Sequence, residues 1–249
     1  MPRIAKAYIS LIIVSGATIL LFAAGSWSSF SFRQFSIFLG LAAVSAAMKV
    51  RIPGIHGSMS PSIVFLVLSM AVCSFAEVAA IALVAALVQS LWLVKRPRLI
   101  QVAFSAAALV LSVALARFCA MLLFGPHAMN SPVALLILAG CIQLSLNTAM
   151  VSAVIGLVEG KPMAQVGRVC FERVFPSFIG GIAFAGLIGG SFSRANLWNG
   201  ALALLPVVIL GYLYALNRNT QAAASEPQAH LIEEEELVEV GSRSSRSRR

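Results

Sequence analysis

The side chains best suited to binding a ligand gather in the segment Lys49–Pro61, KVRIPGIHGSMSP. Cations, an imidazole and a hydroxyl lie there among helix-breaking residues, and the candidate site residues are Lys49, Arg51, Pro53, Gly54, His56, Gly57 and Ser58. Proline ends a helix, and glycine permits backbone angles that other residues avoid. The apolar residues between the breakers suit a backbone that is buried against helices or lines a cavity. The pattern predicts either a loop that re-enters the bundle or an ordinary cytoplasmic turn, with Ser58 or Ser60 capping the next helix.

Charges and amides within apolar runs form a second group of candidates. Glu77 and Arg117 lie in such runs, and an ionisable residue at membrane depth suggests a functional site. Both also have structural explanations. The dipole of a starting helix favours a carboxylate at Glu77, and Arg117 is close enough to a helix end to snorkel. Gln89 and Asn147 are further binding candidates, although amides within spans, Gln143 included, more often join helices.

The motifs of common enzymes are absent from the sequence. It contains no HExxH, no P-loop and no GxSxG, and it has no Asp. Only three acids, Glu77, Glu159 and Glu172, lie before residue 220, which leaves few groups for acid–base catalysis. No second metal ligand lies near His56, and the four cysteines are widely spaced, which suits apolar fillers. We therefore expect no catalytic residues, no metal and no cofactor.

The fold class follows from hydropathy. Hydrophobic residues make up 59% of the 249-residue chain and charged residues only 11%, against about 25% in a soluble domain. Runs that are apolar enough to cross a bilayer cover residues 7–24, 35–48, 61–75, 77–94, 99–124, 133–158, 175–190 and 197–216. We expect an all-α integral membrane protein whose residues 1–219 form a bundle of about eight transmembrane helices. Because three of the runs are short, seven is the alternative count.

The placement of Lys and Arg predicts the orientation of this bundle. Alternate loops, counted from the N-terminus, hold eleven of these cations, whereas the opposite loops hold only Arg33 and Arg194. Cytoplasmic loops carry the excess of Lys and Arg, so we expect both termini in the cytoplasm. The net charge of +9 is spread between apolar runs, which favours the headgroups of the lipid bilayer as the partner and not nucleic acid.

Three segments are not simple spans. Residues 1–25 imitate a secretory signal, but we expect them to remain as the first span. Residues 161–174 predict a short amphipathic helix on the cytoplasmic membrane surface, which either relays motion to a partner or serves as a linker. Residues 220–249 carry blocks of Glu and Arg and predict a disordered cytoplasmic tail.

The segment Phe38–Trp92 resembles a bacterial membrane-associated sensor domain. The resemblance rests on KVRIPGIHGSMS at 49–60, Glu77 and ALVQSLW at 86–92, with weaker likeness in RPRLIQVAF at 96–104 and at Asn147 and 156–160. It covers most of residues 35–190 and implies a multi-helix signal-input module of the bacterial inner membrane. In that family the module is commonly fused to a cytoplasmic GGDEF or HD-GYP domain. The 30 residues 220–249 are fewer than a domain needs, so we expect any signalling partner to be a separate protein.

Three functions compete. The leading expectation is a stand-alone sensor-like membrane module without catalytic activity, which binds a ligand or a signalling partner. The second is a small-solute binding or transport protein, because residues 38–92 also resemble, more loosely, the substrate-binding subunits of energy-coupling vitamin importers. An enzyme is third, because the sequence lacks the residues for one.

Overall fold

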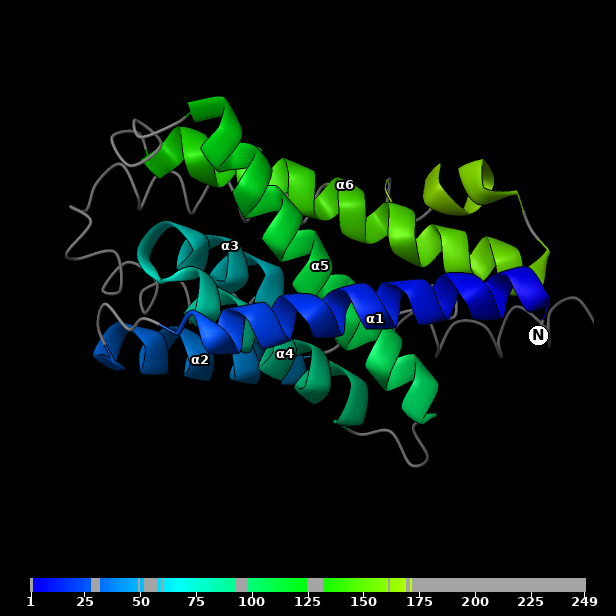
Figure 1. Cartoon of the computed structure of the whole chain (residues 1–249), viewed down its shortest axis with the longest axis horizontal. Coiled ribbons are helices and arrows are strands. Elements are labelled where there is room, and N and C mark those ends of the chain that lie inside the picture. Colours follow the sequence, from blue (N-terminus) through cyan, green and yellow to red (C-terminus); the bar gives the residue numbers. More distant parts are fainter. Residues whose placement is uncertain are drawn as a thin grey trace, which may run out of the picture. The chain divides into compact units, whose positions relative to one another are not determined.

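The computed structural model of the chain describes residues 2–27, 32–48, 50–51, 58–59, 61–92, 98–124, 132–160, 162–168 and 171. All of them belong to the first of two compact units, Met1–Val208. The second unit, Ile209–Arg249, includes the predicted tail and lies outside the described residues. The elements in chain order are α1 (Arg3–Gly25), α2 (Phe32–Ala47), β1 (Val50–Arg51), β2 (Ser58–Met59), α3 (Ser62–Val72), α4 (Phe75–Leu91), α5 (Leu99–Phe124) and α6 (Pro132–Glu159) (Figure 1).

Three of the described helices are long and apolar enough to cross a membrane. They are α1, α5 and α6, in which the best windows reach a mean hydropathy of 2.2, 2.3 and 1.7. At 1.5 Å per residue, helices of this length cover the hydrocarbon core of about 30 Å. The structure therefore supports an all-helical membrane protein, as the composition predicts.

Three further described helices are apolar but short. At 16, 11 and 17 residues, α2, α3 and α4 reach about 24, 16 and 26 Å. Each lies where a span was predicted, yet none meets the length of a full crossing by itself. The predicted spans at 175–190 and 197–216 lie outside the described residues. The count of eight spans therefore stays a prediction.

A two-stranded antiparallel ladder separates α2 from α3. Val50 pairs with Met59, and Arg51 pairs with Ser58. The residue that caps α3 is Pro61, and no side chain caps this helix. The expectation that Ser58 or Ser60 caps the next helix is therefore wrong, because Pro61 occupies the N-cap position and the backbone of Ser58 pairs in the ladder.

Contacts near the helix ends give the helix directions. The Tyr8 hydroxyl donates to the Met150 carbonyl at 3.4 Å, and the Tyr8 ring packs against Phe104. Toward the other end of α1, Phe22 packs edge-on against Phe75 at the start of α4. The start of α1 thus lies beside the start of α5 and the end of α6, and the end of α1 lies beside the start of α4 (Figure 1).

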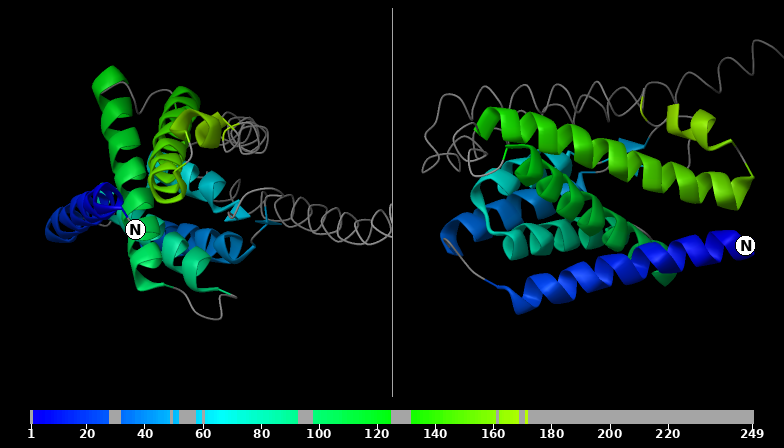
Figure 2. Two further views of the ribbon diagram at one scale, coloured as in Figure 1. Left: turned by 90° about the vertical axis from the view of Figure 1, so that its right-hand side faces the viewer. Right: turned by 45° about the horizontal axis from the view of Figure 1, so that its top comes forward.

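The packing of α1 depends on α5, and α2 contributes little to it. In the left view of Figure 2, α5 lies between α1 and α2. Helices α1 and α5 approach each other closely at Gly16, where an added Cβ would lie 2.6 Å from both the Cα and the Cβ of Ala107. Only a residue without a side chain allows this approach. The outward side of α1 is apolar: Ile4, Leu11 and Val14 are 71%, 63% and 62% exposed, which suits contact with lipid.

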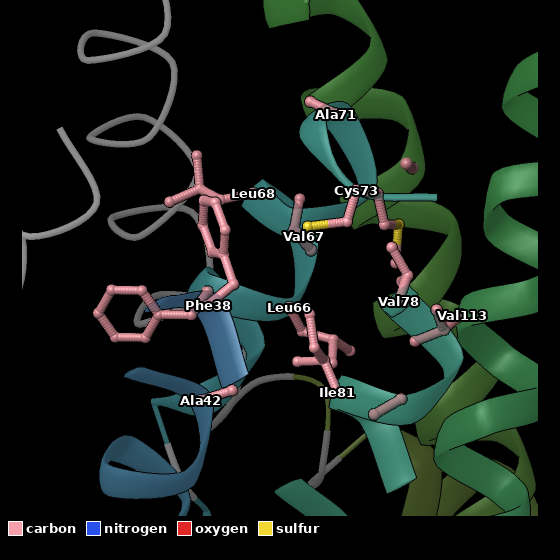
Figure 3. Close-up of a cluster of buried hydrophobic side chains, with 14 of the residues drawn as sticks. Phe38, Ala42, Leu66, Val67, Leu68, Ala71, Cys73, Val78, Ile81 and Val113 are labelled. Carbon is pink, nitrogen blue, oxygen red and sulfur yellow. The ribbon is translucent and has the colours of Figure 1, made fainter. Parts of the chain in front are cut away.

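The main core lies around α3. Nine of the eleven residues of this helix are buried. Figure 3 shows side chains of α2, α3, α4 and α5 converging on it, among them Phe38, Leu66, Ile81 and Val113. A helix that is apolar all round suits either a protein core or lipid contact, and α3 takes the central place in the core.

A short helix over residues 163–168 follows α6. Val166 is 8% exposed, and an added Cβ on Gly167 would lie 3.6 Å from the Ser152 Oγ of α6. Met163, which the sequence places on the apolar face, is 50% exposed. The structure therefore has a helix within the predicted amphipathic segment, and its buried side faces α6.

Candidate functional site

The break between α3 and α4 is the main polar feature of the bundle interior. Cys73 is extended and Ser74 is the N-cap of α4. The break forms because a serine hydroxyl followed three residues later by a carboxylate satisfies the free N–H groups of a new helix start. Cys73, Ser74 and Glu77 are 4%, 3% and 1% exposed.

Ser74 and Glu77 cap the helix reciprocally. The Ser74 N–H donates to the Glu77 Oε2 at 2.8 Å, and the Glu77 N–H donates to the Ser74 Oγ at 3.3 Å. The carboxylate also lies in the first turn of α4, where the positive end of the helix dipole stabilises it. The structural explanation that the sequence offers for Glu77 is therefore present in the fold.

Arg117 of α5 reaches the same break from a neighbouring helix. Its Nη1 donates to the Cys73 carbonyl oxygen at 2.8 Å. Arg117 is only partly exposed, so its guanidinium is directed into the protein, and the snorkelling alternative does not describe this contact. This hydrogen bond joins α5 to the break, although Cys73 and Arg117 are 44 residues apart in the sequence.

Two opposite charges therefore act on one peptide unit. Arg117 binds the carbonyl of the Cys73–Ser74 peptide, and Glu77 accepts from its N–H. Hydrogen bonds to ionised groups are roughly twice as strong as neutral ones, and a dry environment raises the cost of losing either. We call this set, Cys73, Ser74, Glu77 and Arg117, the charge centre.

The charge centre lies at membrane depth if α5 spans the bilayer symmetrically. Arg117 is between five and six residues past the middle of α5 (Leu99–Phe124), or about 8 Å along its axis. The hydrocarbon core extends about 15 Å to either side of its midplane. Irregular backbone is tolerated at such depth only where protein satisfies its polar groups. The charge centre satisfies both polar groups of the Cys73–Ser74 peptide.

The loop candidates lie elsewhere. Arg51 and Ser58 pair in the β1–β2 ladder, and Lys49, Pro53, Gly54, His56 and Gly57 lie outside the described residues. The ladder precedes α3, whereas the charge centre follows it. The two are therefore separated by a helix of about 16 Å.

Gln89 and Asn147 do not join Glu77 either. Gln89 is twelve residues beyond Glu77 on α4, a separation of about 18 Å along the helix. Asn147 lies on α6 one turn before Met150, which contacts Tyr8 beside Phe104. Phe104 is thirteen residues or about 20 Å before Arg117 on α5. The structure therefore places the described candidates in separate locations, and only Glu77 lies in the charge centre.

Two members of this centre, Cys73 and Ser74, are missing from the residues that the sequence singles out, and Arg117 is singled out without its role in the centre. The Ser74-x-x-Glu77 pattern is the signature of a capping box and would have identified Ser74 and the start of α4. Arg117 stood out as a charge within a span, but a snorkelling explanation was available. The Cys73 carbonyl carries no signal in the sequence, since every residue has one.

The charge centre holds the break between α3 and α4 through hydrogen bonds to its backbone. Within the part of the chain that the structure describes, no group of three or more His, Cys, Asp or Glu side chains could hold a metal ion. Cys73, Cys119 and Cys141 are free thiols there. Comparison with protein families, curated proteins and solved structures finds no match to the chain.

Proposed function

We propose that the chain is a sensor-like, non-catalytic membrane module that binds a ligand or a signalling partner and responds at its charge centre. The observation that carries the proposal is the peptide unit between α3 and α4, bonded by Arg117 on one side and by Glu77 on the other. A break held by two opposite charges has a second arrangement available, in which the charges separate. Switching elements need such discrete alternatives.

The charge centre is connected to one end of the bundle through α3. This helix begins three residues after β2 and ends at Cys73, so a shift at the break would move the ladder and its loop. Because the core around α3 is close-packed, displacement of one end is carried to the other. The loop 49–61, the most specific part of the resemblance to sensor domains, is then the output of the module.

The proposal includes the full topology: about eight spans in a bacterial inner membrane, with both termini in the cytoplasm. Exposed cations support this orientation. Arg3 and Lys6 lie in the first turns of α1, Arg98 precedes α5, and Arg168 follows α6. The start of α1, the start of α5 and the end of α6 lie close to one another, so these cations gather at one end of the bundle. Arg33, at the start of α2, belongs to the opposite end. Cytoplasmic ends carry the excess of cations.

The test is a comparison of protein and small-molecule companions after purification in mild detergent. We expect the wild-type protein to retain a cytoplasmic signalling protein whose output changes when residues 49–60 are exchanged. Arg117→Gln should alter that output at least several-fold, whereas Arg33→Gln, at an exposed position of α2, should leave it unchanged. Arg117→Lys keeps the charge and provides a folded comparison. If mass spectrometry finds no such partner and no ligand, the sensor proposal fails.

A second candidate is a small-solute binding or transport protein. The break between α3 and α4 favours it, because discontinuous helices form the substrate sites of many secondary transporters. This function requires a small molecule that accompanies the purified protein, or uptake of that molecule into vesicles carrying the protein. Retention of a signalling protein without any solute would decide against it.

A further inference from the structure

Gln143 of α6 has a buried side-chain amide that forms no hydrogen bond to any residue that the structure describes. Gln143 is 0% exposed, and among the described residues neither its Oε1 nor its Nε2 has a partner. Gln143 lies between two and three residues from the middle of α6, or about 4 Å along the axis. A polar group at that depth cannot turn to bulk water.

Burial of an unsatisfied amide is costly, because its hydrogen bonds to water are lost without replacement. Native proteins pair nearly all buried polar atoms, with protein or with bound molecules. An amide that only joined helices, as the sequence suggests for Gln143, would bond to a neighbouring helix. Its Oε1 and Nε2 lack such a bond among the described residues.

The surroundings of Gln143 are small on one side and polar on the other. Side chains of a helix lean over the residues three and four positions earlier, which here are Gly140 and Ala139. These residues take up little volume beside the amide. Asn147 lies one turn further along the same face and is half-buried.

We propose that Gln143 binds a small neutral molecule that both donates and accepts hydrogen bonds, with Asn147 as the adjacent polar group. The Oε1 accepts from the bound molecule and the Nε2 donates to it. A neutral molecule is favoured because neither amide carries a charge to balance an ion. Water is the smallest member of this class, and small amides are the next.

The sign of a stability change tests the proposal. Gln143→Leu keeps similar volume and removes both polar atoms. If the amide holds a molecule, the variant loses those bonds, and its unfolding midpoint in detergent should fall by about 2–4 °C. If the amide is merely unsatisfied, the variant removes a penalty and the midpoint should rise, which would overturn the proposal. Gln101→Leu, at an exposed position of α5, is the matched control and should shift the midpoint much less.

A second readout detects the bound molecule directly. In protein labelled with 15N at glutamine side chains, the Gln143 amide signal is the one missing from Gln143→Leu. We expect a magnetisation-transfer peak from this amide to water, or to added acetamide. Acetamide that raises the wild-type midpoint and leaves Gln143→Leu unaffected identifies a solute, and a transfer peak to water alone identifies water. The absence of any transfer peak contradicts the proposal.

Discussion

Ser74 is the N-cap of α4 and directly follows Cys73, the C-cap of α3. Its hydroxyl takes part in the capping box of the charge centre. The Ser74 Oγ accepts from the Glu77 N–H, which has no carbonyl partner in the first turn of α4. Capping residues of this kind contribute about 1 kcal/mol. In a buried site the Glu77 N–H cannot bond to water when the Ser74 hydroxyl is removed. The loss of stability on removing the cap therefore falls in the upper part of the range of about 0.5–2 kcal/mol.

We predict that Ser74→Ala lowers the free energy of unfolding by about 1–2 kcal/mol. Ser36→Ala is the matched control, because the exposed Ser36 hydroxyl only donates to the Phe32 carbonyl within α2. That control should change stability by less than about 0.5 kcal/mol. Denaturant unfolding of the two variants in the same detergent measures the difference. Equal losses in both would mean that the capping box contributes nothing special.

Arg117 and Glu77 should also prove energetically coupled. We predict that Arg117→Met costs about 2–4 kcal/mol, because it leaves the Cys73 carbonyl without its donor and Glu77 without the opposite charge across the peptide. In the double variant Arg117→Met/Glu77→Gln, the loss should be smaller than the sum of the two single losses. A double-mutant cycle in unfolding free energy measures the coupling. Strict additivity would show that the two charges act independently.

At the scale of the elements, the sequence predicts each of the six labelled helices to within a few residues, and it does not predict the two-stranded ladder. The bounds of α5 agree with the predicted 99–124, because its apolar run is continuous and Gly125-Pro126 follows. The start of α4 was placed at Glu77 and lies at Phe75, since the cap and not the charge fixes it. The ladder gives no periodic pattern, because its strands have only two residues each.

The contact between α1 and α5 yields a prediction for these elements. Gly16→Ala should destabilise the protein by about 1–3 kcal/mol, because the new methyl group would collide with Ala107 at 2.6 Å. Gly40→Ala in α2 is the control, since nothing lies within 4 Å of its added Cβ, and it should stabilise by up to about 1 kcal/mol. Thermal unfolding in detergent compares the two. A midpoint for Gly16→Ala equal to or above that of Gly40→Ala would show that the added methyl group meets no collision at Ala107.

At the scale of the whole molecule, the candidate site could be predicted only in part. Glu77 was identified from its type and position, but its partners come from Ser74 nearby and from α5, 40 residues away. Contacts between distant helices depend on how the helices pack, which hydropathy does not determine. The separation of Asn147 from Glu77 has the same origin, whereas that of Gln89 follows from the twelve residues of α4 between them.

The orientation of the bundle gives a prediction at this scale. In a variant whose own cysteines are replaced, Arg98→Cys should react with a membrane-impermeant thiol reagent only after the cytoplasmic side is opened. Trp27→Cys, at an exposed position after α1, should react with the same reagent from outside intact cells. Arg98 is exposed at the start of α5, so both positions are accessible. The reverse pattern would invert the proposed topology.

The partnership of Gly16 with Ala107 also bears on synthesis. The ribosome completes α1 at Gly25, and 82 residues separate that point from Ala107. At about 5–20 residues per second, α1 waits roughly 4–16 s before its main partner exists. During this time α2, α3 and α4 are made, and the surface of α1 around Gly16 is not yet covered by α5. The contact between α1 and α5 is therefore a late step of assembly, and among the main packing partners of α1 in the described part of the chain only α4, through Phe75, is made before α5.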